Sequence, residues 1–213
     1  MKEDLDIIKL NKEAWDNAAK SYNQESHGKI YPLFNYFCNT LPEKGYILDL
    51  GSGTGLPYTK LLIERGFKVL GIDLFPEMIK IAKENVPSAK FIEMSMTDLE
   101  YKNKFDGIFS SYSMLLLNPQ LFNETAKKIV QALKTGGLFY LCLNAPWEEG
   151  LNLDKDVIIE FKGRKMYSRP YSKEEILDFF IPLSMKLLKL ENEVINSETW
   201  GRENMNTFIF KLE

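Results

Sequence analysis

Several residue types and patterns are scarce in this chain of 213 residues. It holds a single histidine, His27, and two cysteines, Cys38 and Cys142, which lie far apart and in apolar surroundings. We therefore expect no metal site and interpret both cysteines as reduced core thiols of a cytoplasmic protein. No apolar run approaches the ~20 residues of a membrane-spanning helix. The charged segment 1–6 is unlike a signal peptide, so no membrane partner is expected.

An excess of charge of one sign is also missing. The chain has 27 Lys and Arg against 30 Asp and Glu, a formal net charge of −3, and no dense basic run. This balance gives no electrostatic reason to expect a nucleic-acid partner. Hydrophobic and charged contents of 45% and 27% are ordinary for a globular protein. The length fits one α/β domain, and we predict a single domain over residues 1–213.

Apolar runs and helix-period patterns alternate through residue 143. An apolar run over 46–50 predicts a buried strand, and it leads directly into glycines at alternate positions. The alternation of strands and helices predicts a mostly parallel sheet with helices on both faces. The further strands are expected over 67–73, 90–94, 105–110 and 138–143. The helices are expected over 3–24, 29–41, 57–65, from Pro76 onward and over 118–134.

The last third of the chain has a different pattern. Residues 156–161 and 165–169 flank Gly163 and indicate a hairpin that lies over the sheet, as a small insertion within 151–170. Ser172 and Glu175 form a capping box that predicts a helix to about residue 181. Residues 185–191 and 205–212 predict a closing antiparallel pair. The predicted fold is a three-layer α/β/α sandwich with a doubly wound, mostly parallel seven-stranded sheet and an N-terminal helical cap over 1–44.

The glycine turn 51–55 predicts a ligand site. Glycines let a ligand approach the backbone closely, and the following helix N-terminus offers unpaired N–H groups. Asp73 ends the next strand, about 20 residues further on, where a carboxylate can accept hydrogen bonds from ribose hydroxyls. The third glycine of an NAD fingerprint, G-x-G-x-x-G, would fall on Leu56, and the lysine of a P-loop is missing. The pattern therefore favours a nucleoside with little or no phosphate.

The segments 47–55 (ILDLGSGTG) and 69–79 (VLGIDLFPEMI) resemble the class I, Rossmann-like S-adenosylmethionine (SAM)-dependent methyltransferases. The resemblance covers nearly the whole chain, including the N-terminal helix segment 15–22, the segment 105–115 and the approach to the fifth strand, 133–139. It implies SAM as cofactor and methyl transfer as the reaction.

The resemblance also implies roles for individual residues. Asp49 would arrange the glycine turn or meet the amino group of SAM, and Asp73 would take the ribose. The other residues implied at the cofactor are Tyr22, Gly51, Ser52, Gly53, Leu74, Met78, Ser95, Met96 and Ser110. In this set, Leu74 and Met96 would sandwich the adenine, and Tyr22 would close over the methionine end from the N-terminal helix.

Some of these residues have plainer interpretations. Family members commonly have Gly-Asp where this chain has Met94-Ser95, so either Ser95 or Asp98 would have to meet the adenine edge; both could instead cap the next segment. Tyr22 fits equally a simple core face of its helix. No catalytic residue is identified. The candidates are Tyr22, His27 and Tyr112, with His27 better explained as a solvated loop residue.

The leading hypothesis is a SAM-dependent methyltransferase that acts on a small-molecule acceptor, as a monomer or homodimer. A correctly aligned nucleophile supplies most of the catalysis, because the sulfonium of SAM is already an activated leaving group. The alternatives are a non-catalytic SAM-binding or interaction protein and, disfavoured by Leu56, an NAD-dependent oxidoreductase. The acceptor and its reacting atom are not specified by the sequence.

Overall fold

The computed structural model describes residues 2–23, 33–147, 158–197 and 201–213. The helices are α1 (Lys2–Asn23), α2 (Phe34–Thr40), α3 (Tyr58–Glu64), α4 (Pro76–Asn85), α5 (Pro119–Ala132) and α6 (Lys173–Phe180). The strands are β1 (Tyr46–Leu50), β2 (Lys68–Asp73), β3 (Lys90–Glu93), β4 (Phe105–Ser111), β5 (Leu133–Asn144), β6 (Ile158–Phe161), β7 (Arg164–Tyr167), β8 (Met185–Ser197) and β9 (Gly201–Leu212). Short 3₁₀ turns are η1 (Met96–Asp98), η2 (Met114–Leu116) and η3 (Ile181–Leu183).

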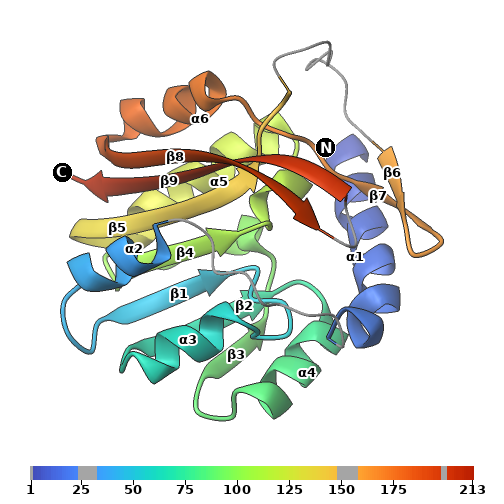
Figure 1. The fold of residues 1–213 in the computed structure, drawn as a ribbon, viewed down its shortest axis with the longest axis horizontal. Helices are drawn as coiled ribbons and strands as arrows, with labels where there is room; N and C mark the ends of the chain where they lie inside the picture. Colours follow the sequence, from blue (N-terminus) through green and yellow to red (C-terminus); the bar gives the residue numbers. More distant parts are fainter. Residues whose placement is uncertain (1, 24–32, 148–157, 198–200) are drawn as a thin grey trace.

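A seven-stranded sheet in the order β3-β2-β1-β4-β5-β9-β8 forms the middle layer (Figure 1). Strands β1 to β5 pair in parallel, whereas β9 runs antiparallel to both β5 and β8. The predicted doubly wound sheet with a C-terminal antiparallel pair is therefore confirmed. The central strands are apolar along their length because both faces are covered by helices.

The order of the strands reverses at β1, which pairs with β2 on one side and with β4 on the other. The chain winds outward through β2 and β3 and then returns to β4. In open α/β sheets such a reversal leaves a crevice at the carboxyl ends of the strands, where ligands bind. The glycine turn that follows β1 lies at this crevice.

Two hydrophobic clusters cover the two faces of the sheet. One packs α2 and α3 against the sheet through residues such as Phe37, Leu62 and Phe109. The other packs α5 and α6 against the opposite face through residues such as Phe122, Phe180 and Phe210. Cys38 and Cys142 are buried and free, as predicted, and burial raises the pKa of their thiols to about 11 and about 12.

Helix α1 stands beside the edge where the parallel strands end, with the β6–β7 hairpin on its outer side (Figure 1). The hairpin packs on α1 through Phe161 and Met166, which contact Ala14 and Ala18. The hairpin predicted from the sequence is confirmed, but its expected place over the sheet is wrong. Small alanines on one face of α1 leave room for the large hairpin side chains, and this face supplies the apolar contact.

Several boundaries differ from the sequence-based expectation. The helix expected over 118–134 ends at Ala132, because Leu133 is buried and already pairs with Phe105 in the sheet. Within the described residues, α2 begins only at Phe34, after a left-handed Leu33. Strands β8 and β9 are longer than expected. They stay paired from Met185 and Leu212 at one end to Ser197 and Gly201 at the other.

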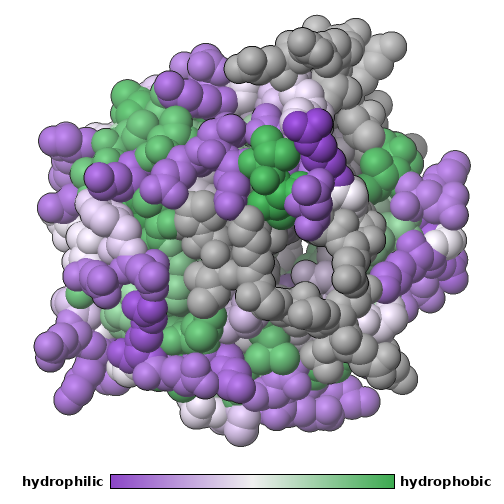
Figure 2. Space-filling view, in the orientation of Figure 1, coloured by the Kyte–Doolittle hydropathy of each residue, from purple (hydrophilic) through white to green (hydrophobic). Residues whose placement is uncertain are grey.

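The surface seen in Figure 2 is mostly hydrophilic, with scattered hydrophobic patches. The large apolar side chains that are most exposed are Ile158, Ile181 and Val194, which lie on separate elements. No helix in the described parts of the chain is long and apolar enough to span a membrane.

Candidate functional site

The glycine turn is anchored to the end of the neighbouring strand. The backbone N–H groups of Gly51 and Ser52 both donate to the carbonyl oxygen of Ile72, at 2.9 Å each. Within the turn, the N–H of Gly55 donates to the carbonyl of Ser52 at 2.9 Å. These bonds hold the turn after β1 against the end of β2.

The three glycines have different surroundings, although all have positive φ. A Cβ on Gly51 would lie 2.3 Å from the Cβ of Ser113, and one on Gly55 would lie 3.2 Å from the ring of Phe91. At Gly53 a Cβ would meet nothing within 4 Å. Packing against Ser113 thus excludes a Cβ at Gly51, whereas at Gly55 the neighbouring side chains would have to move by only a few tenths of an ångström. The space above Gly53 is left open by the described residues, as a turn that receives a ligand requires.

Asp73 lies at the end of β2 beside this open space and is only 5% exposed. Its Oδ2 accepts from the N–H of Gly53 at 2.7 Å, and its Oδ1 accepts from the N–H of Phe75 at 3.0 Å. Burial raises the pKa of Asp73 to about 6, and these N–H donors oppose the shift. Each carboxylate oxygen can accept a second hydrogen bond, so acceptor capacity remains for a ligand hydroxyl.

Asp49 is buried beneath the turn and binds within the protein. Its Oδ2 accepts a short hydrogen bond from the hydroxyl of Thr59, on the first turn of α3. Burial raises its pKa to about 7; the Thr59 bond opposes this shift, and the nearby Asp73 adds to it. The arrangement favours the first role suggested for Asp49, ordering of the turn and of α3.

The segment after β4 forms the opposite wall of the crevice. The hydroxyls of Ser110 and Ser113 lie 2.8 Å apart, and that of Ser113 donates to the carbonyl of Leu50 at 2.6 Å. Both serines are buried. Ser113 therefore ties the exit of β4 directly to the start of the glycine turn. Sequence reasoning missed Ser113, because only its contact with Gly51 reveals it.

Tyr112 lies between these serines in a left-handed conformation, with φ of 55°. Its N–H donates to the carbonyl of Cys142 at 2.9 Å, and its hydroxyl donates to the sulfur of Met205. The side chain thus contacts β9. A bulky residue in this conformation is uncommon and needs fixing by its surroundings. The catalytic role suggested for Tyr112 stays a prediction.

The residues expected around adenine are only partly brought together. The Cε of Met96 lies 3.6 Å from the Cβ position of Gly51, so Met96 borders the glycine turn. Met78 is buried in the contact between α4 and α1. Ser95 caps η1, where its Oγ accepts from the N–H of Thr97 at 3.2 Å. Asp98 lies exposed on the same turn.

Helix α1 borders the crevice on the side of β2. Lys12 donates through Nζ to the carbonyl of Leu74 at 2.9 Å and lies 3.6 Å from Glu93. Tyr22 is half-buried and meets Trp15 edge-on, with ring centroids 5.3 Å apart. Both aromatic residues pack near Leu74 in the contact between α1 and α4. His27 lies outside the described residues.

A nucleoside cofactor fits the residues at this crevice. The open space over Gly53 can receive ligand atoms, and the adjacent Asp73 keeps acceptor capacity. The buried Oγ of Ser52 has no hydrogen-bond partner among the described residues. This oxygen has almost no accessible surface and lies 2.9 Å from the Cβ position of Gly71, so it faces the interior of the protein; Ser52 could line the ligand space only through its backbone. The described residues include no group of three or more His, Cys, Asp or Glu that could hold a metal ion.

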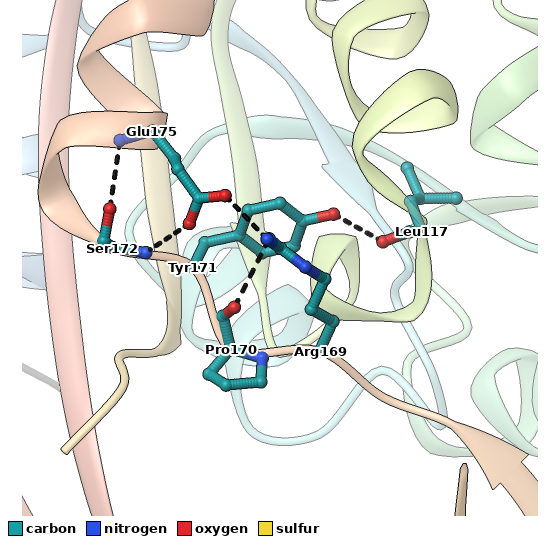
Figure 3. Close-up of polar contacts among 6 residues, drawn as sticks. All are labelled: Leu117, Arg169, Pro170, Tyr171, Ser172 and Glu175. Atoms are coloured by element: carbon teal, nitrogen blue, oxygen red, sulfur yellow. Dashed lines mark hydrogen bonds and ion pairs between the residues drawn. The ribbon is translucent and has the colours of Figure 1, made fainter. Parts of the chain in front are cut away.

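A second polar cluster lies where the hairpin leads into α6 (Figure 3). The guanidinium of Arg169, with 8% of its side chain exposed, donates to Oε1 of Glu175 at 2.7 Å. Glu175 also completes the capping box with Ser172 that the sequence indicated. Tyr171 lies under the guanidinium, 4.4 Å from ring centroid to Cζ. The capping box was recognisable from the sequence, but no local pattern indicated the ion pair between Arg169 and Glu175.

Comparison with known sequences matches the region that carries this geometry to a protein family. Residues 47–137 match the family model described as "Methyltransferase domain". The Bacillus subtilis protein YqeM, whose name places it among the methyltransferases, is 37% identical over 105 residues, which cover 46% of this chain and 42% of that protein. The chain thus spans less than half of that relative's length. The matched region holds the glycine turn, Asp73 and the exit of β4.

Solved structures share the fold at low sequence identity. A SAM-dependent methyltransferase from Methanosarcina mazei aligns with a TM-score of 0.75 and 18% identity, over 87% of this chain and all 100% of that chain. A Burkholderia thailandensis N1-methyltransferase aligns with a TM-score of 0.72 and 14% identity, over 95% of this chain and 87% of its own. That structure contains 1,6-didemethyltoxoflavin and S-adenosylhomocysteine. At these identities the likeness shows the fold.

Proposed function

We propose that this chain, which belongs to the class I SAM-dependent methyltransferases and matches the methyltransferase-domain model over residues 47–137, transfers the methyl group of SAM to a small-molecule acceptor. One observation carries the proposal most directly. The open space over Gly53 lies beside the buried carboxylate of Asp73 at the reversal point of the sheet. Ligands of open α/β sheets bind at this place.

Different residues of the crevice bind different parts of the cofactor. Asp73 takes the ribose hydroxyls, and the backbone of Gly51 to Gly53 lines the methionine part. Ser110 lies beside the methionine end, Leu74 and Met96 border the adenine, and Tyr22 approaches from α1. SAM supplies a methyl group on a sulfonium that is already a good leaving group.

The contribution of the protein to catalysis is alignment. The exit of β4 is fixed by Ser110 and Ser113 on one side, and the glycine turn is fixed by Ile72 on the other. A rigid wall on each side holds an acceptor atom in line with the methyl group, and such positioning can lower a barrier by about 7–11 kcal/mol. We assign no general base to the reaction.

A small-molecule acceptor is supported by charge and by the relatives. The net charge of −3 does not favour a polyanionic nucleic acid. The Burkholderia neighbour contains a small-molecule compound together with S-adenosylhomocysteine. We further propose that the protein acts in the cytoplasm as a monomer or homodimer. The buried, unpaired thiols of Cys38 and Cys142 suit a reducing compartment.

The test is transfer of tritium from [methyl-³H]SAM into compounds of a metabolite extract. The wild type should label an extract compound and release S-adenosylhomocysteine, whereas Asp73→Ala should lose most of this activity through weaker SAM binding. SAM binding without transfer to any extract fraction would favour the alternative of a non-catalytic SAM-binding protein. Binding of NAD in place of SAM would overturn the proposal and favour the oxidoreductase that Leu56 argues against.

A further inference from the structure

A buried amide on α1 joins this helix to the segment after β4 and to the hairpin. Of the α1 side chains that the structure describes, four are almost completely shielded, and Asn11, with 3% exposure, is the polar one beside Ala14, Ala18 and Ala19. A buried amide destabilises a protein unless its hydrogen bonds are satisfied. Its presence on an otherwise apolar face therefore needs an explanation.

Asn11 uses both ends of its amide on distant backbone groups. Its Nδ2 donates to the carbonyl of Leu116 at 3.1 Å, and its Oδ1 accepts from the N–H of Tyr167 at 2.8 Å. A carbonyl can only accept and an N–H can only donate, so the two partners fix the orientation of the amide. Through this one side chain α1 is joined to η2 and to the end of β7.

The carbonyl of Leu116 belongs to a run of three that are all held from outside their own segment. The carbonyl of Leu115 accepts from the N–H of Arg169 at 2.9 Å, and that of Leu117 accepts from the hydroxyl of Tyr171 at 2.6 Å. Asn11 holds the carbonyl between them. Consecutive carbonyls of the segment after β4 are thus fixed in turn by the hairpin link, the N-terminal helix and the residue that leads into α6.

This segment continues directly from the residues that contact the glycine turn. Ser113, one residue before η2, packs against Gly51 and donates to Leu50. A shift of Leu116 would therefore be transmitted along three residues to the wall of the glycine turn. Misplacement by about 1 Å can lower a rate by about a hundredfold when alignment is the main source of catalysis.

We propose that Asn11 is a positioning residue for methyl transfer, an inference that rests on the proposed function. It holds α1, the hairpin and the exit of β4 as one unit around the acceptor. It acts through Leu116 and Tyr167 and does not touch the cofactor. The neighbouring Lys12 holds α1 to Leu74 on the cofactor side by a separate bond. Loss of Asn11 should therefore reduce turnover and leave SAM affinity nearly unchanged.

Two substitutions and a matched control separate this role from general stability. Asn11→Asp keeps an acceptor for the N–H of Tyr167 but removes the donor to Leu116, and Asn11→Leu removes both bonds at similar volume. Asn17→Leu is the control. Asn17 lies on the same helix and also bonds to the hairpin, through Nδ2 to the carbonyl of Lys162 at 3.2 Å, but this contact is exposed.

The first measurement is the kcat and the KM for SAM in the tritium-transfer assay, with the SAM dissociation constant from calorimetry and the folded state from thermal melting. We expect kcat to fall at least about tenfold in Asn11→Leu and in Asn11→Asp, whose ionised carboxylate would face the carbonyl of Leu116 with no proton to donate, with KM and dissociation constant within about threefold of wild type. Asn17→Leu should match the wild type. A kcat in the Asn11 variants equal to that of the wild type, or a SAM affinity that falls in parallel with kcat, would overturn the proposal.

The second measurement does not depend on turnover. Amide hydrogen exchange over residues 114–117 and 164–169 should be at least about tenfold faster in Asn11→Leu than in the wild type or Asn17→Leu. Unchanged exchange would overturn the proposed coupling even if no acceptor is found. Failure of the proposed function would be seen in the wild type itself, as absence of SAM binding and of methyl transfer.

Discussion

Alanine substitutions at two glycines of the same turn should have different consequences for stability and for SAM binding. A Cβ at Gly51 would lie 2.3 Å from the Cβ of Ser113, in addition to adopting φ of 78°. The left-handed conformation costs about 1–2 kcal/mol for a non-glycine residue, and overpacking costs about 1–3 kcal/mol. Gly51→Ala should therefore lower the free energy of unfolding by roughly 2–5 kcal/mol.

Gly53→Ala incurs only the cost of the left-handed backbone conformation and no overpacking. A Cβ there has nothing within 4 Å, so the expected loss of stability is about 1–2 kcal/mol. The new methyl group would occupy the space that we assign to the cofactor. The dissociation constant for SAM should rise at least about tenfold, equivalent to ~1.4 kcal/mol.

Gly66→Ala is the matched control. Gly66 follows α3, has φ of 87° and also has nothing within 4 Å of its Cβ position, but it lies outside the glycine turn. It should show the same loss of stability as Gly53→Ala and unchanged SAM binding. The assays are urea denaturation and calorimetric titration with SAM. Wild-type SAM affinity in Gly53→Ala, or a stability loss as large as in Gly51→Ala, would refute the assignment of the space to a ligand.

Three further predictions concern stability. The folded-state pKa values of Asp49 (about 7) and Asp73 (about 6) lie above their ordinary value, so between these values the folded state binds more protons than the unfolded state. Urea denaturation should therefore show the free energy of unfolding falling as pH rises from about 4 to about 7. The fall should be smaller in Asp49→Asn than in the wild type. Arg169→Ala leaves Glu175 without its ion-pair partner and should cost about 3 kcal/mol by chemical denaturation, whereas a cost near zero would show that the pair is fully solvated. Asn118→Ala removes the side-chain cap that accepts from the first turn of α5 and should cost about 1 kcal/mol in the same assay, with an unchanged midpoint contradicting the cap.

The parts of the fold that depend on neighbours in sequence could be predicted. The apolar run over 46–50 and the capping box of Ser172 and Glu175 each contain their own signal, and the structure has β1 and α6 at those places. The end of α5 could not be placed, because burial of Leu133 against Phe105 outweighs the helical pattern. The packing of the hairpin on α1 likewise depends on alanines more than a hundred residues away.

In the candidate site, too, features set by neighbours in sequence could be predicted, and features set by distant contacts could not. The glycine turn and Asp73 were recognisable from their spacing, whereas Asn11, Ser113 and Arg169 become visible only through partners on other elements. The sequence left two roles open for Asp49, and its bond to Thr59 favours the structural one. The roles of the cofactor-binding residues remain predictions until SAM is bound.

Calorimetric titration of the wild-type protein with SAM and, in parallel, with NAD tests the central claim most directly. We predict saturable binding of SAM at one site per chain, no binding of NAD, and strongly reduced SAM binding in Asp73→Ala. Binding of NAD without SAM, or SAM binding that is unaffected by Asp73→Ala, would contradict the account of this crevice.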